Sequence, residues 1–563
     1  MGHYLTEPYD GSDRYATERY DGATGRDWWA LDPAFRLLMR RHLGDGYAWA
    51  EPYLRELGTV TGGVVASCAV ESDRNPPRLE KYDRWGRDIS RIVMPPSFET
   101  ARAAMMEHNF LSPGFTKRAR ENGADPVALG AAWMYLLDQA DIGLGCALGT
   151  GGEMVVSLAE KYAPPDVRDR VREIFANGDH SGEAAQLLTE RTGGSDLAAL
   201  ETRATPHGQA WLLDGVKWFA SNANGSAYVV LARLPDEQVK PFLVLWERRD
   251  GSRNGVRIRR LKDKLGTRSV AAAEVELTGA EAFLLSGPEA GSGIGAMMGL
   301  TNAARLGIAM MGLGVARRAL VESVCYASAR EAFGAPLIAH PLMRRKLAEL
   351  IVEVEAAQAL VFDGMLNPLR LTPAVIKLRA ARLGVSAASD AVEIHGGNGY
   401  IENWPVARLL RDAQVNPIWE GGDNILCLDV RRAMARENAH EPFLERLAAA
   451  VAGAPDDRAT ADLVAGRLDD LGKAITLWSS LDPVTAEARL FPLARFMGDV
   501  YAAALLLEQA GWEQRAGHGD RKAAVARLYA EAHLADHGPL RGLDRPAEDL
   551  ARFDDLLAGS VAL

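Results

Sequence analysis

Apolar residues recur at helical spacing along the first third of the chain. From Trp28 to about Tyr162 this spacing predicts helices, because every third or fourth residue falls on one helix face. Prolines interrupt the pattern and predict breaks at Pro52 and at Pro76–Pro77. We expect an extended N-terminal segment and a helical domain over residues 1–186.

The pattern changes near residue 187, where short runs of β-branched and aromatic residues replace the helical spacing. Five runs predict strands, at Trp211–Leu213, Tyr228–Ala232, Phe242–Trp246, Val256–Ile258 and Ala273–Leu277. Short strands separated by polar turns are typical of antiparallel pairing. Residues 187–286 are therefore expected to form a middle antiparallel β domain.

Long proline-free segments with helical spacing follow the β domain. They cover residues 289–335, Leu342–Leu366, Ala374–His395 and the stretch from about Asp423. Four long helices in succession predict a four-helix bundle over residues 287–438. An Ala- and Leu-rich remainder predicts an additional C-terminal helical domain over 439–563. The expected fold class is therefore α+β.

Length and composition fit a multidomain globular protein. The 563 residues exceed what one hydrophobic core organises, and 48% apolar with 25% charged residues leaves little polar bias for long disorder. The 64 basic and 75 acidic residues give a net charge of −11. The net negative charge therefore gives no long-range attraction between this protein and polyanions such as nucleic acids.

The C-terminal region bears on nucleic-acid binding. Residues 441–563 hold 13 basic and 20 acidic residues, a difference of −7, so they do not supply clustered positive charge. Two groups of cations, Arg431, Arg432 and Arg436 with Arg521, Lys522 and Arg527, are either a local binding stripe or solvated helix faces. Nucleic acid therefore stays a weakly supported partner.

Cysteine usage and hydropathy point to a soluble protein in a reducing compartment. The four cysteines lie far apart, with no CxxC pair and no His/Cys cluster, so no metal site is predicted. No stretch reaches the roughly 18 apolar residues of a membrane span. We expect a cytoplasmic protein without a membrane partner.

A polar, glycine-containing loop opens the β domain. Gly193 and Gly194 allow a flat ring or a phosphate to approach the backbone, and the hydroxyls of Thr189 and Ser195 can donate hydrogen bonds to it. About twenty residues later a strand ends in two aromatics, Trp218–Phe219, followed by Ala220 and Ser221; such an edge can stack on an aromatic cofactor. A structural turn and a half-buried strand are the alternatives.

Two glycine-containing segments accompany the bundle helices. A long helix is expected to end at Gly334, after Arg330 and Phe333, where an arginine can pair with a phosphate or compensate the helix dipole. Three glycines within four residues follow another helix at 396–399. A helix cap explains one of them, and close approach of a dinucleotide explains all three.

The sequence Trp419-Glu420-Gly421-Gly422 carries the candidate base. Pro417 disfavours helix before it and Asp423 is a plausible N-cap of the next helix, so Glu420 is placed on a loop. A carboxylate beside apolar surface gains proton affinity, which suits a general base. A solvated surface glutamate is the alternative.

Taken in this order, the five elements resemble the acyl-CoA dehydrogenase family of flavoproteins over residues 70–435. Within it the AidB branch, known from the bacterial response to DNA alkylation, is most similar. The resemblance to that branch rests on Asn75-Pro-Pro, Tyr82-Asp83, Gly86-Arg87, Arg260–Ser269, Ile418–Ile425, Cys427–Val430 and the extra C-terminal helices.

The resemblance implies an FAD between the β domain and the bundle of a homotetramer built as a dimer of dimers. By motif correspondence the FAD contacts would come from Thr189, Gly194, Ser195, Trp218, Phe219, Ala220, Ser221, Trp419 and Asn424, with Arg330, Phe333, Gly396 and Gly397 reaching the FAD of the neighbouring subunit. Glu420 would remove the α-proton of an acyl thioester or related small substrate while hydride passes to flavin N5.

Departures from the common family pattern concern the substrate more than the cofactor. Trp419 replaces a common tyrosine, Gly422 a common threonine, and Ala220 a flavin-lining threonine. Two alternatives therefore accompany the dehydrogenase hypothesis. One is a flavin-containing, DNA-binding protective protein, and the other is a flavin oxidase or monooxygenase acting on a C–N or N–N bond.

Overall fold

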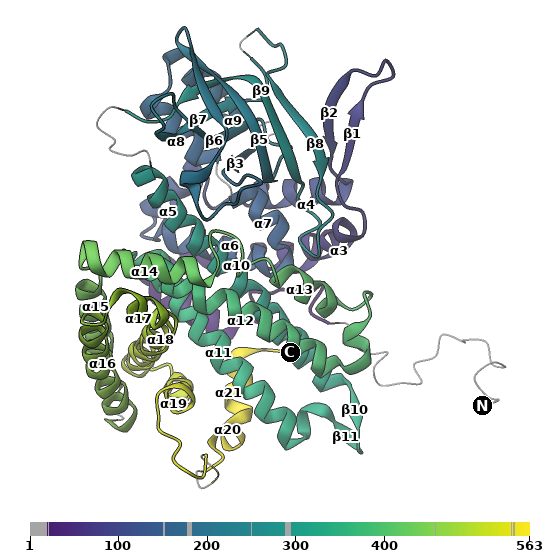
Figure 1. Cartoon of the computed structure of the whole chain (residues 1–563). Helices are drawn as coiled ribbons and strands as arrows, with labels where there is room; N and C mark the ends of the chain where they lie inside the picture. The colour runs from purple at the N-terminus through teal and green to yellow at the C-terminus, as the bar shows by residue number, and fades with distance from the viewer. Residues whose placement is uncertain are drawn as a thin grey trace, which may run out of the picture.

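Four regions follow one another along the chain in the computed structural model (Figure 1). The structure describes residues 20, 22–149, 152–176, 183–248, 250–287, 294–455, 458–541, 543 and 546–563. The β domain lies at one end, the bundle lies in the middle, and the C-terminal helices cover the side of the bundle away from the β domain (Figure 1).

The N-terminal region is mainly helical. Its helices are α1 (Pro33–Leu43), α2 (Tyr47–Val60), α3 (Ala66–Arg74), α4 (Pro96–Glu107), α5 (Pro113–Glu121), α6 (Pro126–Ala140), α7 (Ile142–Gly149), α8 (Gly152–Tyr162) and α9 (Pro165–Ala176). The predicted break at Pro52 is wrong, because Pro52 lies inside α2. The carbonyl that loses its partner there belongs to Ala48, which is exposed, so water can satisfy it.

A β-hairpin interrupts these helices where the sequence predicted only a break, at Pro76–Pro77. Strands β1 (Arg78–Tyr82) and β2 (Asp88–Val93) pair antiparallel around a turn at Gly86. One face packs Leu79 and Ile92 against the β domain. The hairpin therefore projects beside strand β8 (Val256–Leu261) (Figure 1).

The β domain closes into a barrel-like ring. Its other strands are β3 (Ala184–Leu187), β4 (Arg203–His207), β5 (Ala210–Ser221), β6 (Ala227–Arg233), β7 (Val239–Leu245) and β9 (Ala272–Leu284). The order β6-β4-β5-β9-β7 returns to β6, so side chains such as Leu213, Val230 and Phe242 fill the interior. Pairing is mainly antiparallel as predicted, but β3 runs parallel to β6, which the chain reaches only after passing through β4 and β5.

Helices α10 (Ile294–Ala329), α11 (Pro341–Leu366), α12 (Thr372–His395) and α14 (Asp423–Glu437) form the bundle, with α13 (Pro405–Ala413) before α14. Helices α10 and α12 touch backbone to backbone, since a Cβ on Gly312 would lie 2.4 Å from the carbonyl oxygen of Ala380. The predicted helix end at Gly334 is wrong. Helix α10 ends at Ala329, and Gly334, with φ of 82°, forms the turn between β10 (Glu331–Ala332) and β11 (Ala335–Pro336).

The C-terminal helices pack around α18. They are α15 (His440–Ala452), α16 (Arg458–Ser479), α17 (Pro483–Ala488), α18 (Leu490–Arg515), α19 (Arg521–His533), α20 (Glu548–Ala551) and α21 (Phe553–Ser560). Helix α18 is long and apolar enough to cross a membrane, but 78% of its most apolar window is buried in the protein. It is therefore the core helix of this domain.

Most of the cations that could have formed a C-terminal binding stripe take part in ion pairs. Arg521 and Lys522 both lie 2.5 Å from Glu355 of α11 and are largely buried. Arg431 pairs with Glu487 and Arg527 with Glu548, each at 2.6 Å. Four of the six cations thus attach helices to one another and do not form a continuous free surface.

The two ends of the described chain meet at Arg317 in the middle of α10. Its guanidinium lies 3.0 Å from Asp32 and donates to the carbonyl oxygens of Leu31, at 3.0 Å, and Ser560, at 2.9 Å. Ala562 N–H also donates to the carbonyl oxygen of Leu31. One buried cation therefore joins the first helix, the bundle and the last helix.

Candidate active site

A strained turn between α13 and α14 carries Glu420. Its φ is 55° and that of Gly421 is 100°, so two successive residues lie in the left-handed region. A non-glycine residue is uncommon there, and such strain persists where the surrounding structure fixes a functional group. Glu420 is half-buried, and Trp419 beside it packs against the bundle core.

Two buried cations hold this turn from the bundle side. Arg305 of α10 donates from Nε to the carbonyl oxygen of Glu420 at 3.3 Å and pairs with Asp429 of α14 at 2.6 Å. Lys377 of α12 donates from Nζ to the carbonyl oxygen of Gly421. Side chains from three helices therefore fix the two carbonyls that follow the Glu420 Cα.

Burial and the two cations act in opposite directions on the proton affinity of Glu420. Burial raises the pKa of Glu420, while the charges of Lys377 and Arg305 lower it in part, and burial dominates. Burial also lowers the pKa of Lys377 to about 8, and Arg305 acts in the same direction. The turn therefore carries a carboxylate with raised basicity close to positive charge.

No sequence motif pointed to Arg305 or Lys377. Both lie inside apolar helical segments, and their partners at the Glu420 turn are 115 and 44 residues away. One signal was available: Lys377 lies between Ile376 and Leu378, where the helical pattern requires burial. A lysine at such a position needs a specific partner.

The loop that opens the β domain is tied to strand β5. Trp218 N–H donates to the carbonyl oxygen of Thr189 at 2.9 Å, and Glu190 bridges to Gly193. A Cβ on Gly194 would lie 2.4 Å from Thr189 Oγ1, so only glycine fits there. Ser195 is exposed on the same loop. The structure thus brings together the two motifs that the sequence placed twenty residues apart.

A buried ion pair fixes this junction and was not predicted. Lys217 Nζ lies 2.6 Å from Glu190 Oε1, and their side chains are 0% and 3% exposed. Glu190 also accepts from Thr202 N–H at 3.1 Å, and Lys217 donates to the carbonyl oxygen of Leu231 at 2.7 Å. Burial alone would raise the pKa of Glu190, but Lys217 and these hydrogen bonds hold it below its usual value.

The aromatic edge of β5 faces positive charge. Lys262 lies 3.5 Å from the centre of the Trp218 ring, and Arg191 lies 5.1 Å from it. Phe219 is exposed, Ala220 is buried and Ser221 is half-buried. The edge therefore combines an aromatic surface with cations that can attract an anionic or electron-rich ring.

Helix α7 lies near both the end of β5 and the Glu420 turn. Asn222, just after β5, donates to the carbonyl oxygen of Ala147 at 3.4 Å. Burial raises the pKa of Cys146 to about 12, with the charges of Lys264 and Glu420 acting on it in opposite directions. The end of β5 and Glu420 are therefore both close to the same helix.

The remaining predicted residues lie at the far ends of the long helices. Arg330 follows α10 twenty-five residues after Arg305, about 37 Å along a helix. Gly396 and Gly397 begin the short helix η7 (Gly396–Tyr400), about 28 Å beyond Lys377 on α12. These residues, with Phe333 on the β10–β11 turn, therefore lie apart from Glu420 in the same chain.

Asn424 occupies the first turn of α14 and is exposed. It lies four residues after Glu420, at the N-terminus of a helix, where backbone N–H groups favour an anionic ligand. Across the described residues, no group of three or more His, Cys, Asp or Glu side chains could hold a metal ion.

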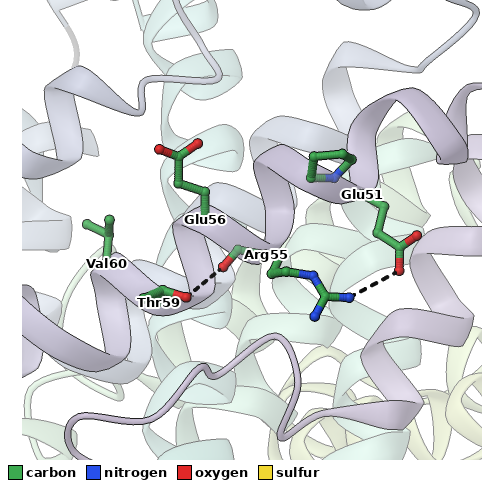
Figure 2. A pocket seen from close by; sticks show the side chains of 6 residues that line it. Glu51, Arg55, Glu56, Thr59 and Val60 are labelled. Atoms are coloured by element: carbon green, nitrogen blue, oxygen red, sulfur yellow. Dashed lines mark hydrogen bonds and ion pairs between the residues drawn. The ribbon is translucent and has the colours of Figure 1, made fainter.

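Figure 2 shows a depression on the outer face of α2 that is separate from these motifs. Arg55 lies 3.9 Å from Glu51, and Thr59 Oγ1 donates to the Arg55 carbonyl oxygen at 3.1 Å. All of its lining residues belong to one helix. This depression therefore has no opposing wall that could position a reactant.

Three successive parts of the chain match the domains of known protein families. Residues 21–171 match the AidB N-terminal domain, 185–280 the acyl-CoA dehydrogenase middle domain, and 291–435 the acyl-CoA dehydrogenase C-terminal domain. The matched ranges correspond to the helical region, the barrel and the bundle. The C-terminal helices lie beyond them.

Individual relatives cover most of the chain. The putative acyl-CoA dehydrogenase AidB of Escherichia coli is 31% identical over 70% of this chain and 76% of its own length. Acyl-CoA dehydrogenase family member 11 of Caenorhabditis elegans is 27% identical over 90% of this chain and 87% of its own. The crystal structure of Caenorhabditis elegans ACDH-11 with C11-CoA, at 25% identity, covers 94% of this chain and 96% of its own, with a TM-score of 0.83. The chain belongs to the acyl-CoA dehydrogenase family of FAD-dependent oxidoreductases, with an AidB-type N-terminal domain.

Proposed function

We propose that this protein dehydrogenates the acyl chain of a CoA thioester, with Glu420 as the base. The observation that carries the proposal is the strained turn on which Arg305 and Lys377 fix a carboxylate of raised pKa. The C11-CoA bound by the related Caenorhabditis elegans protein supports a thioester substrate. Trp419 and Gly422, beside the base, are positions where acyl selectivity would be set.

The residues at the β5 edge fit FAD. Nothing lies within 4 Å of the place that a Cβ on Gly193 would take, which leaves room for a ring or phosphate. Thr189 and Ser195 supply hydroxyl donors, and Trp218 supplies an aromatic ring. Trp218–Ser221 would line the ring system from the β domain, while Trp419 and Asn424 would contact it from the bundle side. When bound, FAD accepts the hydride that leaves the β-carbon of the substrate.

Glu420 removes the α-proton to its carboxylate oxygen in this reaction. The strained φ fixes the direction of the side chain, so little conformational freedom is lost when the substrate arrives. The Glu420 N–H makes no backbone hydrogen bond with the described residues, and it can donate to the enolate oxygen as charge develops. By holding the carbonyls of Glu420 and Gly421, Arg305 and Lys377 keep the Glu420 N–H and its carboxylate in fixed positions relative to each other.

Anaerobic titration of the purified holoprotein with acyl-CoA thioesters of increasing chain length tests this function. Loss of the oxidised flavin absorbance with a thioester, and formation of the enoyl product, is the expected result. Bleaching by small amines alone, or rapid reoxidation of the reduced flavin by oxygen, would instead support the oxidase or monooxygenase alternative.

We further propose that two chains complete each FAD site, within a dimer-of-dimers tetramer. Phe333 is 97% exposed, and Leu342, at the start of α11, and Tyr400, at the end of η7, are also exposed. Exposed apolar groups of this kind mark a surface that a partner covers. Arg330, Gly396 and Gly397 lie with this surface and far from Glu420 in the same chain, which supports their action on the FAD of a neighbour.

Phe333→Asp should separate subunits and weaken FAD binding together. Burying a charge in place of a phenyl ring opposes association, and the neighbour's Arg330 then leaves the cofactor. Mass photometry and flavin release on dilution measure the two effects. Val484→Asp, at an exposed position on α17, is the matched control and should change neither. Full flavin retention by a Phe333→Asp monomer would contradict the shared site.

The hairpin β1–β2 supports nucleic-acid binding as a second candidate function. Its tip carries Trp85, 75% exposed, between Arg84 and Arg87, and Tyr82 is also exposed. Aromatic rings beside arginines can stack on unpaired bases while the cations contact phosphates. Most of the C-terminal cations are paired, so the tip of this hairpin is the better candidate for contact with nucleic acid.

Trp85→Ala with Arg84→Ala should weaken retention of single-stranded DNA in a gel shift by about tenfold, since one stacked base is worth about 1–3 kcal/mol. Binding by the unchanged protein should fall steeply between two salt concentrations. Equal retention by variant and parent, or salt-independent retention, would exclude the hairpin as the contact.

A further inference from the structure

A cavity of about 640 Å³ lies between the bundle and the C-terminal helices. Helices α11 and α12 form one wall, and α18 and α19 close it from the side away from the β domain (Figure 1). Its volume falls within the roughly 300–1,000 Å³ of small-molecule sites. None of the residues predicted to bind FAD lines it.

The cavity has an apolar floor. Ala356, Ala357 and Leu360 of α11 face Leu378 and Leu383 of α12, and Phe491 of α18 lies at the edge. Burial of an aliphatic chain against such an apolar surface is favourable, because it removes apolar area from water.

The rim of the cavity carries three arginines, Arg379, Arg382 and Arg495. Arg379 is engaged by Asp499 at 2.9 Å and Tyr529 at 3.0 Å, and Arg382 pairs with Asp423 at 2.7 Å. Arg495 is exposed and makes no hydrogen bond or ion pair with any residue that the structure describes. Arg495 is therefore the rim arginine that is open to an anionic ligand.

We propose that this cavity binds an aliphatic monocarboxylate, with its head group at the arginine rim and its chain over the alanine floor. A carboxylate matches the planar fork of a guanidinium, and its single charge pairs with the single open arginine, Arg495. A phosphate dianion would meet repulsion from Glu353 and Asp423. The inference goes beyond the proposed dehydrogenation, because it places a second ligand outside the catalytic site.

The cavity is linked to the catalytic turn through Asp423. Arg382 donates to Asp423 Oδ2 from Nε at 2.9 Å and from Nη2 at 2.7 Å. Asp423 begins α14, three residues after Glu420. A carboxylate that competes for Arg382 would release one tether of the turn, leaving Lys377 on Gly421. Occupancy should therefore slow proton removal.

Decanoate is the probe, and the holoprotein carrying Glu420→Gln removes turnover from the binding measurement. Isothermal titration should show decanoate binding that Arg495→Glu weakens at least ~10-fold, as expected for loss of a charged hydrogen-bond partner. Ala357→Phe, which fills the floor, should weaken it as well. Lys473→Glu, a charge reversal at an exposed position on α16, is the matched control and should bind like the parent.

Two further probes separate the head group from the chain. Decanol lacks the charge and butyrate lacks the chain, so both should bind more weakly than decanoate. Equal affinity in the Arg495→Glu and Lys473→Glu proteins would overturn the proposal, as would displacement of decanoate by sulfate at equal concentration. A change of mass in Arg495→Glu with unchanged decanoate binding would also overturn it and assign this face to a second copy of the chain.

A rate measurement then tests the link to the turn. In the protein with Glu420 intact, decanoate should slow flavin reduction, and Arg495→Glu should abolish this inhibition. The binding experiment does not depend on the proposed function, whereas the rate experiment does. A protein that binds decanoate but reduces no flavin with any thioester would therefore refute the catalytic proposal alone.

Discussion

Glu420→Gln should slow flavin reduction by acyl-CoA about 10²- to 10⁴-fold, the contribution of a positioned general base. Glutamine keeps the shape of the side chain and the backbone contacts of Arg305 and Lys377, so the fold should persist. Rapid-mixing absorbance under anaerobic conditions measures the rate. Undiminished reduction by a correctly folded, yellow variant would overturn the assignment of the base.

The pH dependence of the same rate follows from the burial of Glu420. Only the deprotonated carboxylate can accept the α-proton, so the rate should fall as pH drops through the pKa of Glu420. Because burial raises that pKa, the fall should begin above the usual range of a glutamate. The Glu420→Gln variant should retain no such acid limb in its residual rate.

Lys217→Met should destabilise the protein by about 3–5 kcal/mol, the cost of breaking a buried ion pair from one side. The variant leaves Glu190 charged and buried next to the Thr189 loop and Trp218. FAD should therefore be released at lower denaturant concentration as well. Chemical denaturation followed by tryptophan and flavin fluorescence measures both transitions.

The matched control is Arg203→Met, which breaks an ion pair in the same domain between side chains that are both 62% exposed. It should cost less than about 1 kcal/mol. The pH dependence gives a further check. Because the pKa of Glu190 is lowered in the folded protein, its stabilising effect is present above the unfolded pKa and is lost as pH falls through the folded pKa. Equal loss in the two variants would contradict the role of the buried pair.

Regular elements were predictable where local pattern and burial agree. Helix α11 begins at Pro341 and ends at Leu366, one residue from the sequence boundary at its start, because proline and the apolar period mark the same place. Glu420 was found because Pro417 and two glycines exclude a helix around it. The hairpin β1–β2 escaped prediction since charged residues are spread along both strands and the few aliphatic residues, Leu79 in β1 with Ile89, Ile92 and Val93 in β2, follow no clear period of two.

The site was only half predictable for a related reason. Sequence motifs report residues that contact a ligand, whereas Arg305, Lys377 and Lys217 act on backbone carbonyls and on a carboxylate brought near by folding. Their partners lie 27 to 115 residues away. A single sequence holds no record of such pairs, because nothing local distinguishes a tethering lysine from a solvated one. The distance of Arg330 from Glu420 likewise becomes clear only from the length of α10.

The contacts of Arg317 with residues far apart in the sequence have a consequence for biosynthesis. Ser560 is synthesised 243 residues after Arg317, so the guanidinium in the middle of α10 has no Ser560 carbonyl to bind until translation has passed α21. Its partners Leu31 and Asp32 are made before α10. Docking of α21 is thus a late step at this junction, and it follows the synthesis of α1 and α10 by more than two hundred residues.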